Sequence, residues 1–237
     1  MICSLYNEDC LNTLSNIKSG TIDLIVTDPP YELENHGGGK SDLARRDLCN
    51  NTDEFVGFMS DGFNYDLILT EFVRVCKNPN MYIFCSNNQL SKLLHFFESM
   101  SLSATVLVWN KTNPVPFCNG KYLSDIEFIV YVRGKGVTFN NQTPFEYKHK
   151  FYQSSVVPNK DRLHTAQKPI DLLKRYILLS SNNGDTILDC FMGSGSTGVA
   201  CVQTDRNFIG IEINKKYFDI AKNRIEQEKH NINRRLF

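Results

Sequence analysis

The sequence predicts an α/β domain built on a mostly parallel sheet of roughly seven strands that contains one antiparallel hairpin. Short apolar, β-branched runs alternate along the chain with longer segments of helical periodicity. The run at 22–27 (IDLIVT) is apolar almost throughout, which is typical of a strand buried on both faces. The length of 237 residues fits one large α/β domain with a modest insertion.

Each expected element has a local reason. The first helix starts at Asn7 and stops before Gly20, and Pro169 opens a later one. No convincing helix separates residues 105–110 from 126–133, so these two strands are predicted to pair antiparallel. The predicted strands span residues 2–6, 22–27, 81–86, 105–110, 126–133, 186–190 and 207–213. The other predicted helices span residues 53–77, 89–99, 169–181, 196–204 and 215–230.

Composition excludes several protein classes. Hydrophobic residues make up 41% of the chain and charged residues 22%, which is ordinary for a globular protein and unlike a fibre or a disordered tail. No apolar stretch is long enough for a membrane span, and the N-terminus does not resemble a secretory signal, so a cytoplasmic location is expected. The eight cysteines show neither CxxC spacing nor a partner histidine, so no disulfide and no metal site are predicted.

Charge is unevenly distributed although the formal net charge is zero. Residues 101–168 contain nine Lys and Arg but only four Asp and Glu. A local basic surface is therefore expected within a neutral chain.

A glycine-rich turn follows the predicted strand at 186–190. The segment 189–198 (DCFMGSGSTG) runs from a strand through closely spaced glycines into a helix, so backbone N–H groups and the helix N-terminus can approach a ligand. Glu212 ends the next strand, where its carboxylate can accept hydrogen bonds from both hydroxyls of a ribose. These features predict a nucleoside site that favours an adenosine-type ligand.

The same glycine spacing also fits a dinucleotide fingerprint. Only 25 residues follow Glu212, which leaves no room for a second mononucleotide half. Asp189 precedes the glycines and would steer a cationic or amino-bearing ligand, which a pyrophosphate is not. A nicotinamide-dependent dehydrogenase therefore stays a remote alternative.

A second unusual strand end is the tetrapeptide Asp28-Pro29-Pro30-Tyr31, directly after the buried run at 22–27. Two successive prolines fix the backbone and supply no N–H groups, so Asp28 and Pro29 present only acceptors there. A carboxylate beside a fixed carbonyl matches the two hydrogens of an exocyclic amino group. Tyr31 adds a flat face on which a base can stack.

Together these motifs resemble the amino-group DNA methyltransferases of the β class, which use S-adenosylmethionine and act on N6 of adenine or N4 of cytosine. The catalytic motif DPPY precedes the cofactor motif FMGSG at 191–195, as in that class. The segments HTAQKP at 164–169 and NEDC at 7–10 are also similar to cofactor-contacting segments of the family. The resemblance implies a single Rossmann-like methyltransferase domain with a short inserted recognition region.

The resemblance assigns roles to individual residues. The implied catalytic set is Asp28, Pro29, Pro30 and Tyr31, which would accept hydrogen bonds from the target amino group and stack on a base flipped out of duplex DNA. The implied S-adenosylmethionine site comprises Asp9, Cys10, Lys168, Pro169, Asp189, Phe191, Gly193, Ser194, Gly195, Thr197, Glu212 and Ile213. Asp as the first letter of the tetrapeptide favours adenine within the family. The alternatives are an N4-cytosine enzyme, an RNA adenine methyltransferase and a catalytically silent DNA-binding subunit.

Target recognition is expected in residues 134–163, between a catalytic part at 1–133 and a cofactor-binding part at 164–237. Aromatic residues interleave there with cations, a pattern that suits phosphate contact and base stacking. The predicted nucleic-acid contacts are Lys40, Arg45, Arg46, Lys148, Lys150 and Arg162. Because about 30 residues form a small reading surface, a second copy of the chain is a plausible partner, giving a homodimer on double-stranded DNA.

Overall fold

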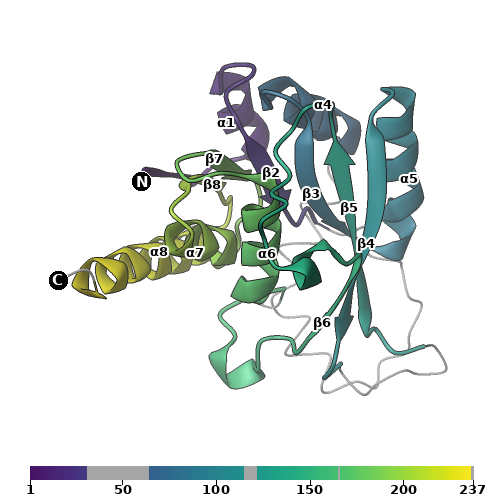
Figure 1. Cartoon of the computed structure of the whole chain (residues 1–237). Helices are drawn as coiled ribbons and strands as arrows, with labels where there is room; N and C mark the ends of the chain where they lie inside the picture. The colour runs from purple at the N-terminus through teal and green to yellow at the C-terminus, as the bar shows by residue number, and fades with distance from the viewer. Residues whose placement is uncertain (31–63, 115–121, 165, 236–237) are drawn as a thin grey trace, which may run out of the picture.

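The computed structural model describes residues 1–30, 64–114, 122–164 and 166–235. Eight strands of this part form one sheet in the order β1-β8-β7-β2-β3-β5-β4-β6 (Figure 1). The strands are β1 (Cys3–Tyr6), β2 (Leu24–Thr27), β3 (Asn80–Cys85), β4 (Ser103–Lys111), β5 (Ile126–Arg133), β6 (Phe151–Ser154), β7 (Thr186–Asp189) and β8 (Asn207–Ile211). The predicted α/β class is confirmed.

The sheet is parallel except for β5. This strand lies between β3 and β4 and runs antiparallel to both, with Tyr82 opposite Tyr131 and Val106 opposite Val130. The predicted antiparallel hairpin is therefore present as β4 and β5. One consequence is that the beginning of β5 lies at the same edge of the sheet as the ends of β2, β3 and β4.

The prediction of roughly seven strands is one strand short. The additional strand, β6, lies in the 134–163 region and pairs parallel with β4, with Val108 opposite Phe151. Its four residues, FYQS, are too few to show a clear alternation, and half of them are exposed. Backbone pairing along β4, rather than hydrophobic periodicity, holds this edge strand in the sheet.

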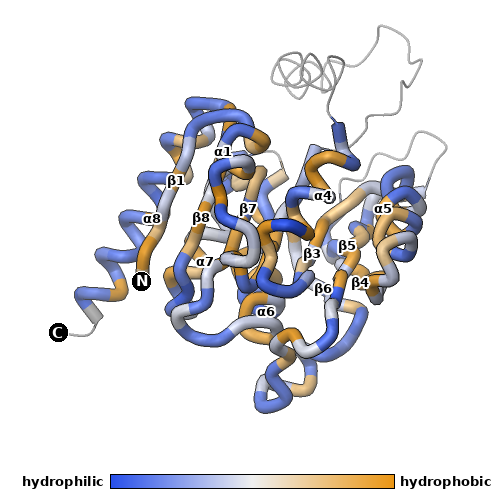
Figure 2. Tube along the Cα trace, turned by 90° about the horizontal axis from the view of Figure 1, so that it is seen from above, coloured by the Kyte–Doolittle hydropathy of each residue, from blue (hydrophilic) through white to orange (hydrophobic). Residues whose placement is uncertain are grey.

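Helices cover both faces of the sheet and create two cores. Alternate residues along each central strand enter opposite cores, for example Tyr82 and Phe84 on one face and Met81 and Ile83 on the other. The first face is covered by α6 (Ile170–Ser180), α7 (Ser196–Gln203) and α8 (Lys215–Arg235), and the second by α1 (Cys10–Asn16), α4 (Tyr65–Val75) and α5 (Asn87–Ser99). Figure 2 shows the apolar strands between more polar outer helices.

The predicted helices are present with adjusted ends. α8 continues five residues beyond the predicted end at 230, and α1 ends before Gly20, which has a positive φ of 70°. α4 starts at Tyr65 with Asn64 as its N-cap, and the predicted helical residues 53–63 lie outside the described residues. Two short 3₁₀ turns, η1 (Phe145–Lys148) and η2 (Asn159–Asp161), flank β6.

No helix in the described ranges is long and apolar enough to cross a membrane. Likewise, the described residues contain no group of three or more His, Cys, Asp or Glu side chains suited to holding a metal ion.

Candidate active site

The two predicted motifs meet at the point where the strand order reverses. From β2 the chain continues to β3 on one side, whereas from β7 it continues to β8 on the other, and β2 and β7 are neighbours. Their carboxyl ends are joined by a hydrogen bond of 2.8 Å from the Thr27 hydroxyl to Asp189 Oδ1. Ligands of open α/β sheets bind at such a switch point.

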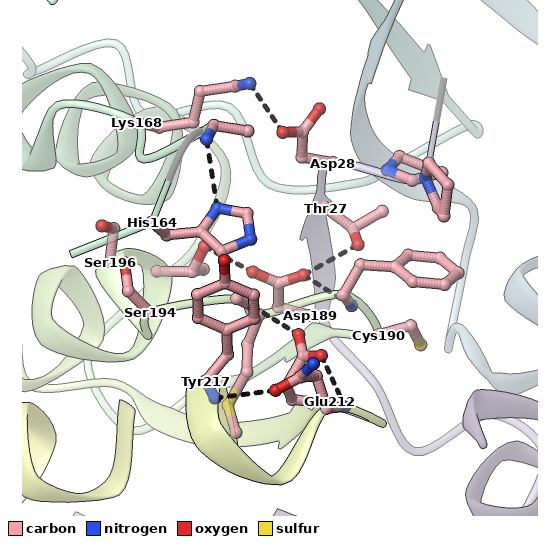
Figure 3. A pocket seen from close by; sticks show the side chains of 18 of the residues that line it. Thr27, Asp28, His164, Lys168, Asp189, Cys190, Ser194, Ser196, Glu212 and Tyr217 are labelled. Carbon is pink, nitrogen blue, oxygen red and sulfur yellow. Dashed lines mark hydrogen bonds and ion pairs between the residues drawn. The ribbon is translucent and has the colours of Figure 1, made fainter. Parts of the chain in front are cut away.

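A cavity of about 470 Å³ opens at this edge. Its volume is in the range of small-molecule and cofactor sites. Predicted site residues that line it are Asp9, Cys10, Asp28, Pro29, Pro30, Lys168, Asp189, Phe191, Gly193, Ser194, Thr197, Glu212 and Ile213. Figure 3 shows Asp28 and Lys168 at one end, Glu212 and Tyr217 at the other, and Asp189 between them.

The cavity lining is acidic. Its described residues include five carboxylates, but Lys168 is the one Lys or Arg among them. The carboxylates belong to Glu8, Asp9, Asp28, Asp189 and Glu212. Such a lining favours a cationic ligand and disfavours a pyrophosphate.

Asp189 is buried at the centre of the cavity wall. Its carboxylate accepts hydrogen bonds from the hydroxyls of Thr27 and Thr197, the latter at 2.6 Å, and from the backbone N–H of Phe191 at 3.1 Å. Burial raises the pKa of Asp189 to about 6, although these hydrogen bonds oppose the shift. The side chain therefore ties β2, α7 and the glycine turn together at one carboxylate.

Glu212 holds the glycine turn at the opposite end. Its Oε2 accepts a hydrogen bond of 2.9 Å from Gly193 N–H and its Oε1 accepts one of 2.9 Å from Asn214 N–H. Each carboxylate oxygen keeps acceptor capacity for a further donor. Asn7 donates to the carbonyls of Glu212 and Ile213 at 2.8 and 3.0 Å, which places the 7–10 turn beside this carboxylate.

Two glycines of the turn have different neighbours. Gly193 has a φ of +50°, and a Cβ there would meet the His164 ring at 3.5 Å. Gly195 has a φ of +80°, and a Cβ there would come within 2.8 Å of Ala221 in α8. Gly195 does not line the cavity, so its observed contact is the close packing of α8 rather than the predicted ligand contact.

The Asp28 end contains a network of buried charges. Lys168 Nζ donates to Asp28 Oδ2 at 2.6 Å and lies 3.3 Å from Glu127 Oε2. Lys111 Nζ lies 3.3 Å from Glu127 Oε1. The Lys168 ammonium also lies 4.9 Å from the centre of the Phe84 ring, a cation–π contact.

Ion pairing dominates the titration of this network. Burial alone would lower the pKa of Lys168, but Asp28 and Glu127 outweigh it and the pKa is raised. Burial alone would raise the pKa of Glu127, but Lys168 and Lys111 outweigh it and the pKa is lowered. Both side chains are therefore charged at neutral pH.

The turn after Asp28 is fixed from α5. Gln89 is buried and donates from Nε2 to the Pro30 carbonyl at 2.9 Å. Its Oε1 accepts from the backbone N–H and the hydroxyl of Ser86, the residue that caps α5. The same amide thus anchors the start of a helix and the proline turn.

Several predicted residues lie elsewhere. Pro169 caps α6 and does not line the cavity. Lys148 donates to the Asn141 carbonyl, Arg162 donates to the Val157 carbonyl, and Lys150 is exposed. Tyr31, Lys40, Arg45 and Arg46 lie outside the described residues.

Sequence reasoning missed two contributors to the site. His164 lines the cavity, packs edge-on against Tyr217 at 4.3 Å between ring centres, and accepts a hydrogen bond from Ala166 N–H. Burial and the charge of Lys168 lower its pKa to about 4. Glu127 reaches the network because β5 is antiparallel. The only available signals were the HTAQKP segment for His164 and a lone acid within an apolar strand for Glu127.

Comparison with known proteins identifies the family. A family model described as DNA methylase, covering N6 and N4 methylases, matches residues 22–223. The chain belongs to this DNA methylase family. The prediction of an amino-group methyltransferase is thereby confirmed. The family match does not support the remote alternative, a nicotinamide-dependent dehydrogenase.

Curated relatives agree with this family. The methylase is 29% identical to the Type II methyltransferase M.HinfI of Haemophilus influenzae over 97% of this chain and 70% of that protein. It is 31% identical to the Type II methyltransferase M.HpaI of Haemophilus parainfluenzae over 96% of this chain and 74% of that protein.

Solved structures agree as well. The SAM complex of M1.HpyAVI has a TM-score of 0.69 and 29% identity, covering 94% of this chain and 100% of that one. The cytosine-N4-specific PvuII DNA methyltransferase has a TM-score of 0.70 over 99% of this chain and 92% of its own, and at 17% identity it shares the fold. S-adenosylmethionine is the cofactor of the family, as predicted.

Proposed function

We propose that the methylase transfers a methyl group from S-adenosylmethionine to N6 of an adenine flipped out of double-stranded DNA. The observation that carries this proposal is the placement of the Asp28-Pro29-Pro30 turn at one end of a cavity whose other end is built around Glu212. One end thus presents acceptors for an amino group, and the other presents a carboxylate for ribose hydroxyls.

The cavity suits the proposed cofactor. S-adenosylmethionine supplies an electrophilic methyl group on a positively charged sulfur. The acidic lining favours such a cation, and Glu212 retains acceptor capacity on both carboxylate oxygens. We assign Asp9, Cys10, Phe191, Gly193, Ser194 and Ile213 to the walls around the cofactor, with Asp189 and Thr197 fixing the turn.

Asp28 and Pro29 act on the target. The adenine amino group is a poor nucleophile because its lone pair is delocalised into the ring. Hydrogen bonds from this group to the Asp28 carboxylate and the Pro29 carbonyl favour tetrahedral nitrogen and stabilise the positive charge that develops there. The prolines and the Gln89 contact hold these acceptors in place before the target arrives.

The DNA-facing surface is proposed from the 134–163 region. Phe145 and Phe151 are 71% and 53% exposed, and Lys150 is exposed beside them in sequence, so aromatic faces and a cation are available to bases and phosphates. The same proposal includes stacking of Tyr31 on the target base and a homodimer on DNA. It assigns phosphate contacts to Lys148, Arg162, Lys40, Arg45 and Arg46.

The proposal is tested with purified protein and labelled S-adenosylmethionine. Unmethylated duplex DNA, the same DNA denatured, and total RNA are each incubated with the protein and digested to nucleosides. We expect the label to appear in N6-methyl-2′-deoxyadenosine, and the amount of label to be highest with the duplex DNA. Label in N4-methylcytosine would change the target base, and label from RNA alone would overturn the choice of DNA.

A further inference from the structure

A run of alternating charges extends along one edge of the sheet from β4 to β2, and two of its members line the cavity. Its members, in spatial order, are Lys111, Glu127, Lys168 and Asp28, with side-chain exposures of 15%, 15%, 7% and 20%. We call these four residues the charged row. Only Asp28 is assigned to the reaction by its motif.

The sheet topology brings the four residues of the charged row together. Asp28 follows β2, Glu127 is the second residue of β5, and Lys111 ends β4. Because β5 is antiparallel to both neighbours, its beginning lies at the same edge as the ends of β2 and β4. Lys168 enters from the segment before α6 and passes the Phe84 ring of β3, the strand between β2 and β5.

Such a row is a costly way to stabilise a fold. Removing charges from water carries a desolvation penalty that the mutual attraction of the ions often fails to exceed. A buried Lys168 paired with Asp28 alone would also compete with the target amino group for the carboxylate. The position of Glu127 on the other side of the ammonium, at 3.3 Å, divides that attraction between two acids.

We propose that Glu127 is a positioning residue for methyl transfer, acting through Lys168 to hold the Asp28 carboxylate fixed in orientation and able to accept from the target amino group. This inference rests on the proposed function. The formal charges of the row, two positive and two negative, sum to zero. Loss of Glu127 leaves one excess positive charge beside the nitrogen on which positive charge develops, so the transition state is selectively destabilised.

The primary test is Glu127→Gln, which keeps the side-chain shape and removes the charge. We expect kcat to fall between about tenfold and a thousandfold, with KM for DNA and the calorimetric Kd for S-adenosylmethionine within about twofold of wild type. The matched control is Glu71→Gln, which makes the same net-charge change in the ion pair of Glu71 and Arg74 on α4. This control is expected to retain wild-type kcat.

A second variant separates charge balance from a purely structural role. Lys111→Met combined with Glu127→Gln restores neutrality, because Asp28 and Lys168 remain as one pair, and Met retains an apolar stem beside Trp109. We expect this double variant to regain part of the kcat lost in Glu127→Gln. If Glu127 only supported the fold, removal of its partner would lower the activity further.

The outcomes are distinct. A Glu127→Gln kcat within twofold of wild type, or a double variant slower than the single one, overturns the positioning role while the proposed function stands. A Glu127→Gln protein that fails to fold leaves the comparison to the double variant, where a wild-type cofactor Kd with a kcat more than about a thousandfold below wild type would also overturn it. A wild-type protein that methylates no DNA overturns the proposed function, and this inference with it.

Discussion

At the residue scale, the pKa values of two side chains in the cavity wall are shifted in opposite directions. Asp189 has its pKa raised to about 6 by burial, and His164 has its pKa lowered to about 4 by burial and by Lys168. Between pH 4 and 6 the folded Asp189 keeps a proton that the unfolded chain loses, so its contribution to stability falls as pH rises. Over nearly the same interval folded His164 lacks a proton that the unfolded chain holds, so its contribution rises with pH.

These opposing slopes predict that the free energy of unfolding of the wild type is flatter between pH 4 and 6.5 than that of either single variant. The change in pKa of each group between the unfolded and folded states corresponds to about 3 kcal/mol. Asp189→Asn should therefore gain stability with rising pH relative to wild type, whereas His164→Gln should lose it. Urea denaturation at four pH values between 4 and 7 measures both slopes.

Parallel curves for wild type and both variants would show that neither side chain titrates with a shifted pKa. The double variant provides a control, since removal of both groups should return a pH dependence close to that of the wild type.

At the element scale, one arginine connects the candidate recognition region to the cofactor half. Arg175 of α6 is buried and donates to the backbone carbonyls of Tyr147 at 2.9 Å and of His149. Its guanidinium also lies 5.0 Å from the centre of the Tyr152 ring in β6. Both η1 and β6 are thereby attached to α6 in addition to the pairing of β6 with β4.

We expect Arg175→Met to loosen η1 and β6 while the cofactor site stays intact. Hydrogen exchange should accelerate at residues 145–154, and affinity for DNA should fall about tenfold, because the surface proposed to contact DNA loses its fixed position. The calorimetric Kd for S-adenosylmethionine should be unchanged. Lys174→Met, on the adjacent and more exposed position of the same helix, is the matched control.

Unchanged exchange at residues 145–154 in Arg175→Met would show that β6 is held by its pairing with β4 alone. Equal loss of DNA affinity in both variants would assign the effect to net charge instead of to anchoring.

The elements also show where sequence patterns suffice. Strands such as β2 and β7 were predictable because an apolar run bounded by Asp-Pro or glycine has few other interpretations. β6 was not, because a four-residue edge strand depends on pairing with a distant partner. The start of α8 was predictable but its C-terminal end was not, since polar, helix-forming residues continue past the amphipathic part.

At the scale of the whole molecule, the order of the strands creates the site. Asp28 and Asp189 are 161 positions apart in the sequence, yet β2 and β7 are neighbours, and the chain leaves them in opposite directions. Both motifs could be found in the sequence because each follows its own strand. The Lys168 and Glu127 pair could not, because it depends on β5 being inserted antiparallel between β3 and β4.

In the proposed reaction Asp28 serves the transfer of a methyl group to adenine N6. The most direct measurement is mass spectrometry of nucleosides from the DNA of a host that lacks its own adenine methylation, expressing either the wild type or Asp28→Ala. We expect N6-methyladenine with the wild type and none with Asp28→Ala, although the variant still binds S-adenosylmethionine. Equal N6-methyladenine from both proteins would contradict it.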